Sequence, residues 1–124
     1  MTKKLTVAEL LKMKDSLVNR KETTKNLYVE SLASEITIKE LPASIIEEAT
    51  GMEERSDEYA LLYGVSEPNL RDASLLAAYE CNEPTDIVVK LFKVGEIKAI
   101  AGELMKLSGY GIDAVKVVDK QIKN

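Results

Sequence analysis

The chain has 124 residues and a formal net charge of −4, and 45% of its residues are hydrophobic and 31% charged. These values predict one soluble globular domain with an aliphatic core, since there is one Phe and no Trp. The apolar runs are shorter than the ~20 residues of a membrane helix, no leader-like start is present, and one cysteine cannot form an internal disulfide. We therefore expect a protein of the reducing cytosol.

The charge changes along the chain. Residues 1–25 carry seven Lys or Arg against three acids, residues 26–86 carry three against fourteen, and residues 87–124 carry seven against four. Phosphate contacts need clustered basic residues, so the acidic middle argues against a nucleic-acid partner. The basic ends either meet an acidic partner, such as the middle of a second copy, or are solvated charge that maintains solubility.

The first 25 residues are predicted to form a basic helix or arm. Thr6 and Glu9 have the spacing of a capping box, in which each side chain accepts a hydrogen bond from the backbone of the other residue. A helix from about Val7 to Val18 follows, with one apolar stripe: Val7, Leu10, Leu11, Leu17 and Val18. Isolated helices of this length are barely stable, so this helix either docks on the core or serves as a mobile arm or partner-binding helix.

From Asn26 the hydrophobic pattern alternates, which predicts a β-hairpin that ends near Lys39. The connection around Ala33 contains no Asn-Gly pair, so its turn type stays open. A lone hairpin is marginal in water, and we expect its apolar face to lie on helices. That face contains Leu27, Val29, Ile36 and Ile38.

Two helices are predicted after the hairpin. Pro42 ends the second strand, and Ser44 with Glu47 forms a second capping-box pattern for a helix that closes at Gly51. An acidic helix then begins at Ser56. The apolar positions are Ile45, Ile46, Ala49 and Met52 in the first helix and Tyr59, Leu62, Tyr63 and Val65 in the second.

Residues 66–79 and 82–92 form two related units, each with a Glu-Pro pair, a capping-type residue and a short apolar segment that ends in an aromatic residue. They predict two short helices, because the residue before a proline is kept out of the helical region. Asp72 is the expected cap of the first helix, and Thr85 with Asp86 opens the second. The residues expected to be buried are Leu75, Leu76, Tyr79, Ile87, Val88, Leu91 and Phe92.

The strongest helical periodicity lies between Glu96 and Ser108, and its apolar stripe contains Ile97, Ile100, Ala101, Leu104 and Ser108. Gly109 is expected to end this helix in a left-handed conformation, with Tyr110 folded back on the last turn. Residues 112–124 are predicted to be a loosely ordered tail, either a loosely held helix or an unpaired segment.

No catalytic or metal-binding cluster is predicted. The carboxylate pairs Glu47/Glu48 and Asp57/Glu58 are adjacent in sequence, so the two members of each pair point to different faces of a helix. Cys81 has no base partner and is interpreted as a small buried hydrophobic residue. With no histidine in the chain, we expect no enzyme activity, no metal and no cofactor.

Together these elements predict an α+β fold, a mainly helical small domain of about five or six helices with one N-terminal β-hairpin. We expect a globular core at residues 26–111, between the basic helix or arm at residues 1–25 and the loosely ordered tail at residues 112–124. These patterns alone indicate no specific function.

A resemblance to a known family adds a function. It covers the chain from about Leu27 onward. The segments that carry it are Glu67-Pro68-Asn69-Leu70, Ala78-Tyr79, Cys81, Glu83-Pro84-Thr85-Asp86-Ile87-Val88, Leu91-Phe92, Gly95-Glu96-Ile97 and Met105-Lys106-Leu107-Ser108-Gly109-Tyr110-Gly111. In these segments the chain resembles the phage XkdN-like tail-assembly chaperones of contractile-tailed phages and defective prophages.

The resemblance implies a tail-assembly chaperone that works in the cytoplasm of the host bacterium and is not retained in the mature virion. It implies binding to the tape-measure protein, which stays soluble until the tail-tube protein polymerises around it. The tail-tube protein is a second candidate partner, and a homo-oligomer is also considered. No nucleic-acid or membrane partner is expected.

We expect the partner to contact the helix at residues 96–108 and the two Glu-Pro units. The candidate apolar contacts are Leu91, Phe92, Ile97, Ile100 and Leu104. The alternative is that these five residues only form the core. A small structural virion protein of the baseplate or tube initiator is the competing function, and a toxin or regulator unrelated to tails is a third.

Overall fold

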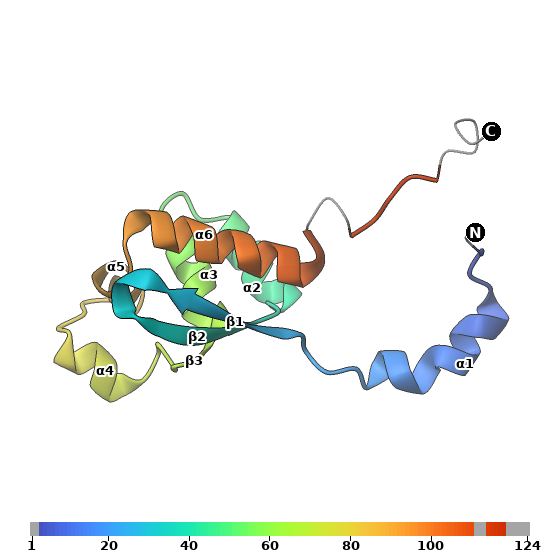
Figure 1. The fold of residues 1–124 in the computed structure, drawn as a ribbon, viewed down its shortest axis with the longest axis horizontal. Helices are drawn as coiled ribbons and strands as arrows, with labels where there is room; N and C mark the ends of the chain where they lie inside the picture. The colour runs from blue at the N-terminus through green and yellow to red at the C-terminus, as the bar shows by residue number, and fades with distance from the viewer. Residues whose placement is uncertain (1–2, 111–113, 119–124) are drawn as a thin grey trace.

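The computed structural model describes residues 3–110 and 114–118 of the chain. In these residues six α-helices accompany a three-stranded antiparallel sheet of order β1-β2-β3. The elements are α1 (Val7–Val18), β1 (Thr24–Val29), β2 (Ser34–Lys39), α2 (Ala43–Thr50), α3 (Ser56–Gly64), β3 (Val65–Glu67), α4 (Ala73–Ala78), α5 (Asp86–Leu91) and α6 (Val94–Met105). Helix α6 runs along the hairpin and α1 stands apart from the body (Figure 1). The predicted α+β, mainly helical fold is confirmed.

The predicted hairpin is present, but it is part of a larger sheet. Leu27 pairs with Ile36, and the predicted inner face is buried at Val29, Ile36 and Ile38 and partly buried at Leu27. A 3₁₀ turn and a left-handed Ala33 (φ 49°, ψ 41°) connect the two strands. The prediction of a lone N-terminal hairpin is wrong, because β3 pairs with β2. A three-residue strand directly after a helix has no periodicity of its own, so the pattern did not reveal it.

Helix α2 begins differently from the prediction. The expected capping box of Ser44 and Glu47 is wrong, because Pro42 occupies the N-cap position and no side chain caps the helix. The Pro42 carbonyl accepts hydrogen bonds from the backbone N–H groups of Ile45 (3.0 Å) and Ile46 (3.2 Å). The proline ring fixes the φ angle of Pro42, here at −63°, and this value is compatible with the extended backbone of an N-cap residue. The predicted start of α3 at Ser56 is confirmed.

The two Glu-Pro units form α4 and α5 as predicted. Asp72 caps α4 by accepting a hydrogen bond from the Leu75 backbone N–H (2.9 Å), and Thr85 occupies the N-cap position of α5. The predicted burial of Tyr79 is wrong, since this residue is 42% exposed. Tyr79 is the C-cap of α4, and the left-handed residue Glu80 (φ 55°) turns the chain immediately after it.

Helix α6 begins two residues before the predicted start at Glu96 and ends as an α-helix at Met105, followed by a wider π-type turn at Lys106–Tyr110. The Ser108 hydroxyl donates to the Leu104 carbonyl (2.8 Å) and competes with the regular backbone bonds there. Gly109 has the predicted left-handed conformation (φ 93°). The expected packing of Tyr110 on the last turn is wrong, because its side chain is 60% exposed.

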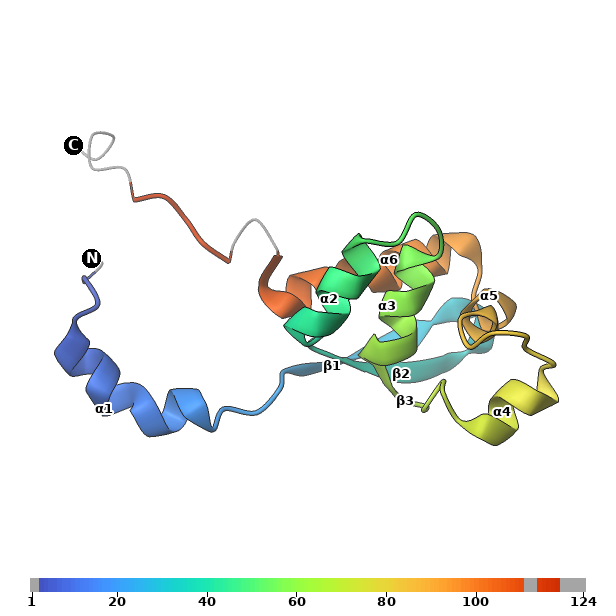
Figure 2. The ribbon, with the colours of Figure 1, turned by 180° about the vertical axis from the view of Figure 1, so that it is seen from behind.

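The core lies between the inner face of the sheet and the helices α3, α5 and α6. Seen from behind, α2 and α3 lie in front of α6, and α4 lies beyond β3 at the edge of the body (Figure 2). The largest fully buried side chains are Ile38, Leu61, Leu70, Ile87, Val88 and Leu104. These residues come from β2, α3, α5, α6 and the segment before α4, so one aliphatic core joins the sheet to these helices.

The predicted tail at residues 112–124 lies outside the described residues except for residues 114–118, which are exposed and form no helix or strand. Among the described helices, none combines the length and the apolar character that crossing a bilayer requires.

Candidate protein-binding surfaces

The structure places most of the predicted partner contacts in the core. Phe92, Ile97, Ile100 and Leu104 are 5%, 5%, 4% and 0% exposed, and Leu91 is partly buried against the core. This burial is what the core alternative predicts. Ile100 nevertheless lines a groove between β1 and α6, and Phe92 and Ile97 line a separate hollow between α3, α5 and the start of α6. The five residues therefore do not meet on one open face.

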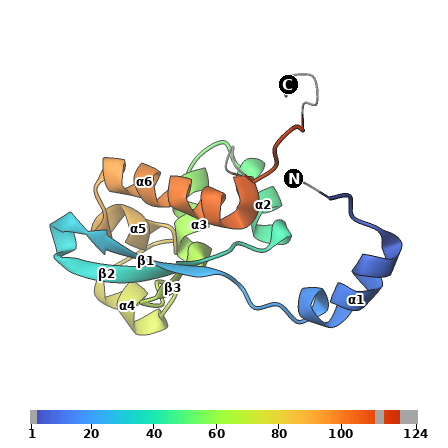
Figure 3. The same ribbon diagram turned by 45° about the vertical axis from the view of Figure 1, so that its right-hand side comes forward.

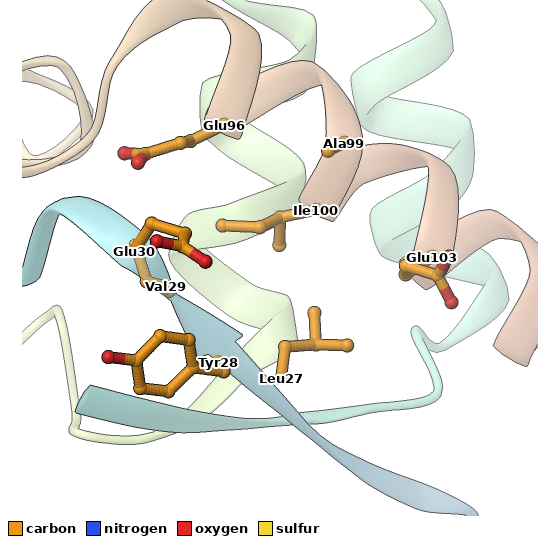
Figure 4. A pocket seen from close by; sticks show the side chains of 8 residues that line it. All are labelled: Leu27, Tyr28, Val29, Glu30, Glu96, Ala99, Ile100 and Glu103. Atoms are coloured by element: carbon orange, nitrogen blue, oxygen red, sulfur yellow. The ribbon is translucent and has the colours of Figure 1, made fainter. Parts of the chain in front are cut away.

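The groove between β1 and α6, here called the β1–α6 groove, has a volume of about 250 Å³. It is lined by Leu27, Tyr28, Val29, Glu30, Glu96, Ala99, Ile100 and Glu103. Leu27 and Ile100 face each other across it, and the three glutamates lie at its margins (Figure 4). Its volume is below the 300–1,000 Å³ of typical small-molecule pockets, so it suits a few apolar side chains of another segment better than a cofactor.

The margins of the β1–α6 groove are acidic. Glu103 is paired with Lys25 (2.9 Å) and Lys106 (3.6 Å), and the hydrogen bond from Lys25 is the main cause that lowers the pKa of the Glu103 carboxyl. The pKa of Glu96 is lowered mainly by the hydrogen bond from the Lys93 backbone N–H, and Ser31 Oγ donates a further one (2.9 Å). Both carboxylates are therefore ionised at neutral pH.

Glu30 and Glu96 add charge that no cation in the described part of the chain neutralises through an ion pair. The β1–α6 groove thus combines an apolar floor with a negative margin. A complementary partner would bring apolar side chains together with a positive charge.

The second surface, here called the α5–α6 hollow, has a volume of about 280 Å³. Its lining residues are Arg55, Ser56, Asp57, Glu58, Val89, Phe92, Val94, Ile97 and Lys98. Val89 and Val94 are 45% and 74% exposed, beside the buried side chains of Phe92 and Ile97. Apolar side chains thus remain in contact with water at a hollow that the core residues Phe92 and Ile97 help to line.

A polar cluster fixes one wall of the α5–α6 hollow. Arg55 Nη1 donates to Asp86 Oδ1 (2.6 Å) and to Thr85 Oγ1 (3.1 Å). Asp86 Oδ2 accepts hydrogen bonds from the backbone N–H groups of Asn82 (2.9 Å) and Glu83 (3.1 Å). The Arg55 guanidinium and these N–H groups lower the pKa of Asp86 to about 2. The sequence contained no local signal for this cluster, because Arg55 and Asp86 are 31 positions apart.

Helix α1 is the third surface. Its predicted capping box is confirmed: Glu9 N donates to Thr6 Oγ1 and Thr6 N donates to Glu9 Oε1, both at 3.2 Å. None of its residues is buried, and the helix projects away from the body on the N-terminal side of β1 (Figure 3). The alternative of a docked core helix is therefore not observed. The apolar side chains of α1 are instead open to a partner.

Among the described residues, no group of three or more Cys, Asp or Glu side chains is placed to hold a metal ion. Cys81 is partly buried against the core, less than the full burial that we expected. Neither feature provides a site of its own.

Comparisons with known proteins agree with this architecture. The family model described as phage XkdN-like tail assembly chaperone protein matches residues 2–123. No curated protein matches the chain. Among solved structures, the crystal structure of the protein YqbN, a structural genomics target, is similar with a TM-score of 0.59 and 14% sequence identity, over 73% of this chain and 87% of that chain. At this identity the structural match supports the fold alone.

Proposed function

Because the chain belongs to the phage XkdN-like tail assembly chaperone family, we propose that it binds the tape-measure protein of its phage or prophage and keeps it in solution during tail assembly. A tape-measure protein is long, helical and apolar, so it aggregates when it is not yet enclosed. A small domain with apolar hollows can cover amphipathic helical segments of such a client. The client is released when the tail-tube protein polymerises around it.

The observation that carries this proposal is the exposure of Val89 and Val94 at the α5–α6 hollow. Two solvent-exposed valines beside a concave surface form a suitable binding site for apolar side chains of a client helix. The predicted contacts Phe92 and Ile97 line that surface. The rim contains both signs of charge, which favours one orientation of the client over others.

The other three predicted contacts lie outside the α5–α6 hollow. Ile100 faces the β1–α6 groove. Leu104 is fully buried in the core, and Leu91 is partly buried against it, so neither lines the α5–α6 hollow. The high density of acidic residues between positions 26 and 86 keeps a complex with an apolar client dispersed.

The experiment is co-expression of the chain with its tape-measure protein, scored by the fraction of tape-measure protein that stays soluble. Val89→Asp and Val94→Asp place a charge in the α5–α6 hollow and are expected to lower that fraction severalfold. The matched control is Val117→Asp, the same change at a valine that is also exposed and belongs to no helix or strand. Circular dichroism checks that each variant keeps its fold.

An unchanged soluble fraction for both hollow variants would refute the proposed contact surface. A tape-measure protein that stays insoluble when it is co-expressed with the unsubstituted chain would refute the proposed function.

The competing function is a small structural component of the baseplate or tube initiator. As a chaperone, the protein acts in the host cytoplasm, performs no catalysis and leaves before the particle is complete. Mass spectrometry of purified particles separates the two functions, since a structural component is present at a fixed copy number whereas the chaperone is absent.

A further inference from the structure

Helix α1 has an apolar face with a single charge at its centre. Lys14 is the residue in question, and its neighbours three and four positions away on the helix are Leu10, Leu11, Leu17 and Val18. Residues at these spacings share one face of an α-helix, so Lys14 is surrounded by apolar side chains on that face. All of them are exposed. A 12-residue helix with no buried residue is marginal in water, which favours a partner that covers this face.

The β1–α6 groove is complementary to this helix face. Its floor is apolar at Leu27 and Ile100, and Glu30 lies at its margin without an ion-pair partner among the described residues. An apolar stripe with a central positive charge therefore matches an apolar floor with a negative margin. Of the acidic positions around the groove, Glu30 is the exposed one, and Glu103 already pairs with Lys25 and Lys106, so Glu30 is the most accessible carboxylate for a lysine of a partner.

We propose that α1 is an exchange arm, which seats its apolar face in the β1–α6 groove of a second copy of this chain and pairs Lys14 with Glu30 there. The exchange is reciprocal, so each contact occurs twice around a two-fold axis. It requires no client and does not involve the α5–α6 hollow, so it is independent of the proposed function.

The path of the chain favours a second copy over the same copy. Glu22 pairs with Lys39 (3.8 Å) and Thr23 N donates to Glu40 Oε1 (2.6 Å), which hold the segment before β1 on β2. Folding α1 back onto its own groove requires a reversal within residues 19–21, and three extended residues span at most about 10 Å. The helix projects away from the body instead (Figures 1 and 3).

The test measures the mass of the purified full chain by light scattering across a dilution series. We expect a concentration-dependent dimer. Lys14→Glu and Glu30→Lys each oppose like charges and are expected to weaken dimerisation by about tenfold or more. The matched control is Lys12→Glu, the same charge change on the polar face of α1, which is expected to leave dimerisation nearly unchanged.

Mixing the Lys14→Glu chain with the Glu30→Lys chain restores opposite charges at both contacts of a mixed dimer, so the mixture is expected to recover dimerisation. Hydrogen exchange of residues 7–18 is expected to slow as the dimer forms. Three outcomes would overturn the proposal: a chain that stays monomeric with fast exchange in α1, a dimer that Lys14→Glu and Lys12→Glu affect equally, or protection of α1 that does not depend on concentration. The last outcome identifies the groove of the same copy as the docking site.

Discussion

Gly64 at the end of α3 lies directly against the Leu104 side chain of α6. A β-carbon at position 64 would lie 2.5 Å from Leu104 Cδ2 and 2.6 Å from Leu104 Cδ1, closer than two such atoms can approach. Leu104 is fully buried, so it has no open space into which it can move. The absence of a side chain at position 64 thus allows α3 and α6 to cross closely at this point.

Gly64→Ala is expected to destabilise the protein by about 1–3 kcal/mol, because the added methyl group forces Leu104 or the helices to shift. Urea unfolding followed by circular dichroism measures the change. Gly102→Ala is the control, since nothing lies within 4 Å of a β-carbon built at this exposed position in the middle of α6. It is expected to stabilise the protein by about 0.5–1 kcal/mol through helix propensity.

Leu104→Ala is expected to cost about 2–5 kcal/mol when introduced alone, because it leaves a cavity in the core. In the double variant Gly64→Ala/Leu104→Ala the new methyl group occupies part of that cavity. The double variant is therefore expected to lose less free energy of unfolding than the sum of the losses in the two single variants. Strict additivity would show that the two residues do not contact each other in solution.

Ser108→Ala is expected to destabilise the protein by about 1–3 kcal/mol, because the backbone N–H of the buried residue Leu41 loses its hydrogen-bond acceptor. Ser108 Oγ accepts a hydrogen bond from the Leu41 backbone N–H (3.0 Å), and Leu41 is only 6% exposed. Ser16→Ala is the control, since the Ser16 hydroxyl donates only to the Met13 carbonyl on the exposed helix α1. Equal unfolding midpoints for the Ser108 variant and the original protein would contradict the role of this bond.

The Arg55–Asp86 pair predicts a dependence of stability on pH. The pKa of Asp86 is lowered from 3.8 to about 2 in the folded protein, mainly by the Arg55 guanidinium. The unfolded chain therefore takes up a proton first, and the stabilisation by this group is complete above about pH 4 and decreases as the pH falls toward 2. We expect Asp86→Asn to be less stable than the original protein at pH 6, with a difference that narrows as the pH falls to 2. A difference that is constant over this range would argue against the pair.

Thr6→Ala is expected to destabilise α1 locally by about 1 kcal/mol, because the backbone N–H of Glu9 loses its capping acceptor. The global unfolding midpoint is expected to stay unchanged in dilute solution, since no residue of α1 is buried. Carbon chemical shifts of residues 7–18 report the loss of helix, and Thr6→Ser retains the cap as a control. A lower global midpoint for Thr6→Ala would mean that α1 is docked on the body.

The elements that the sequence predicted correctly have short-range causes. The capping residues Thr6 and Asp72, the alternation along the hairpin and the left-handed Gly109 each depend on residues only a few positions apart. Such short-range signals can be read directly from the amino-acid sequence. The family, too, was visible in the sequence, because the recurring segments around the Glu-Pro units are stretches of adjacent residues.

The tertiary structure alone decided which of these segments meet. The addition of β3 to the hairpin, the fit of Gly64 to Leu104 and the Arg55–Asp86 pair all join positions that are far apart in the chain. The β1–α6 groove and the α5–α6 hollow are formed by such long-range contacts, so no local pattern could indicate them. Periodicity identified Ile97 and Ile100 as apolar positions, but only packing determined that both are buried and that Val94 is left exposed beside them.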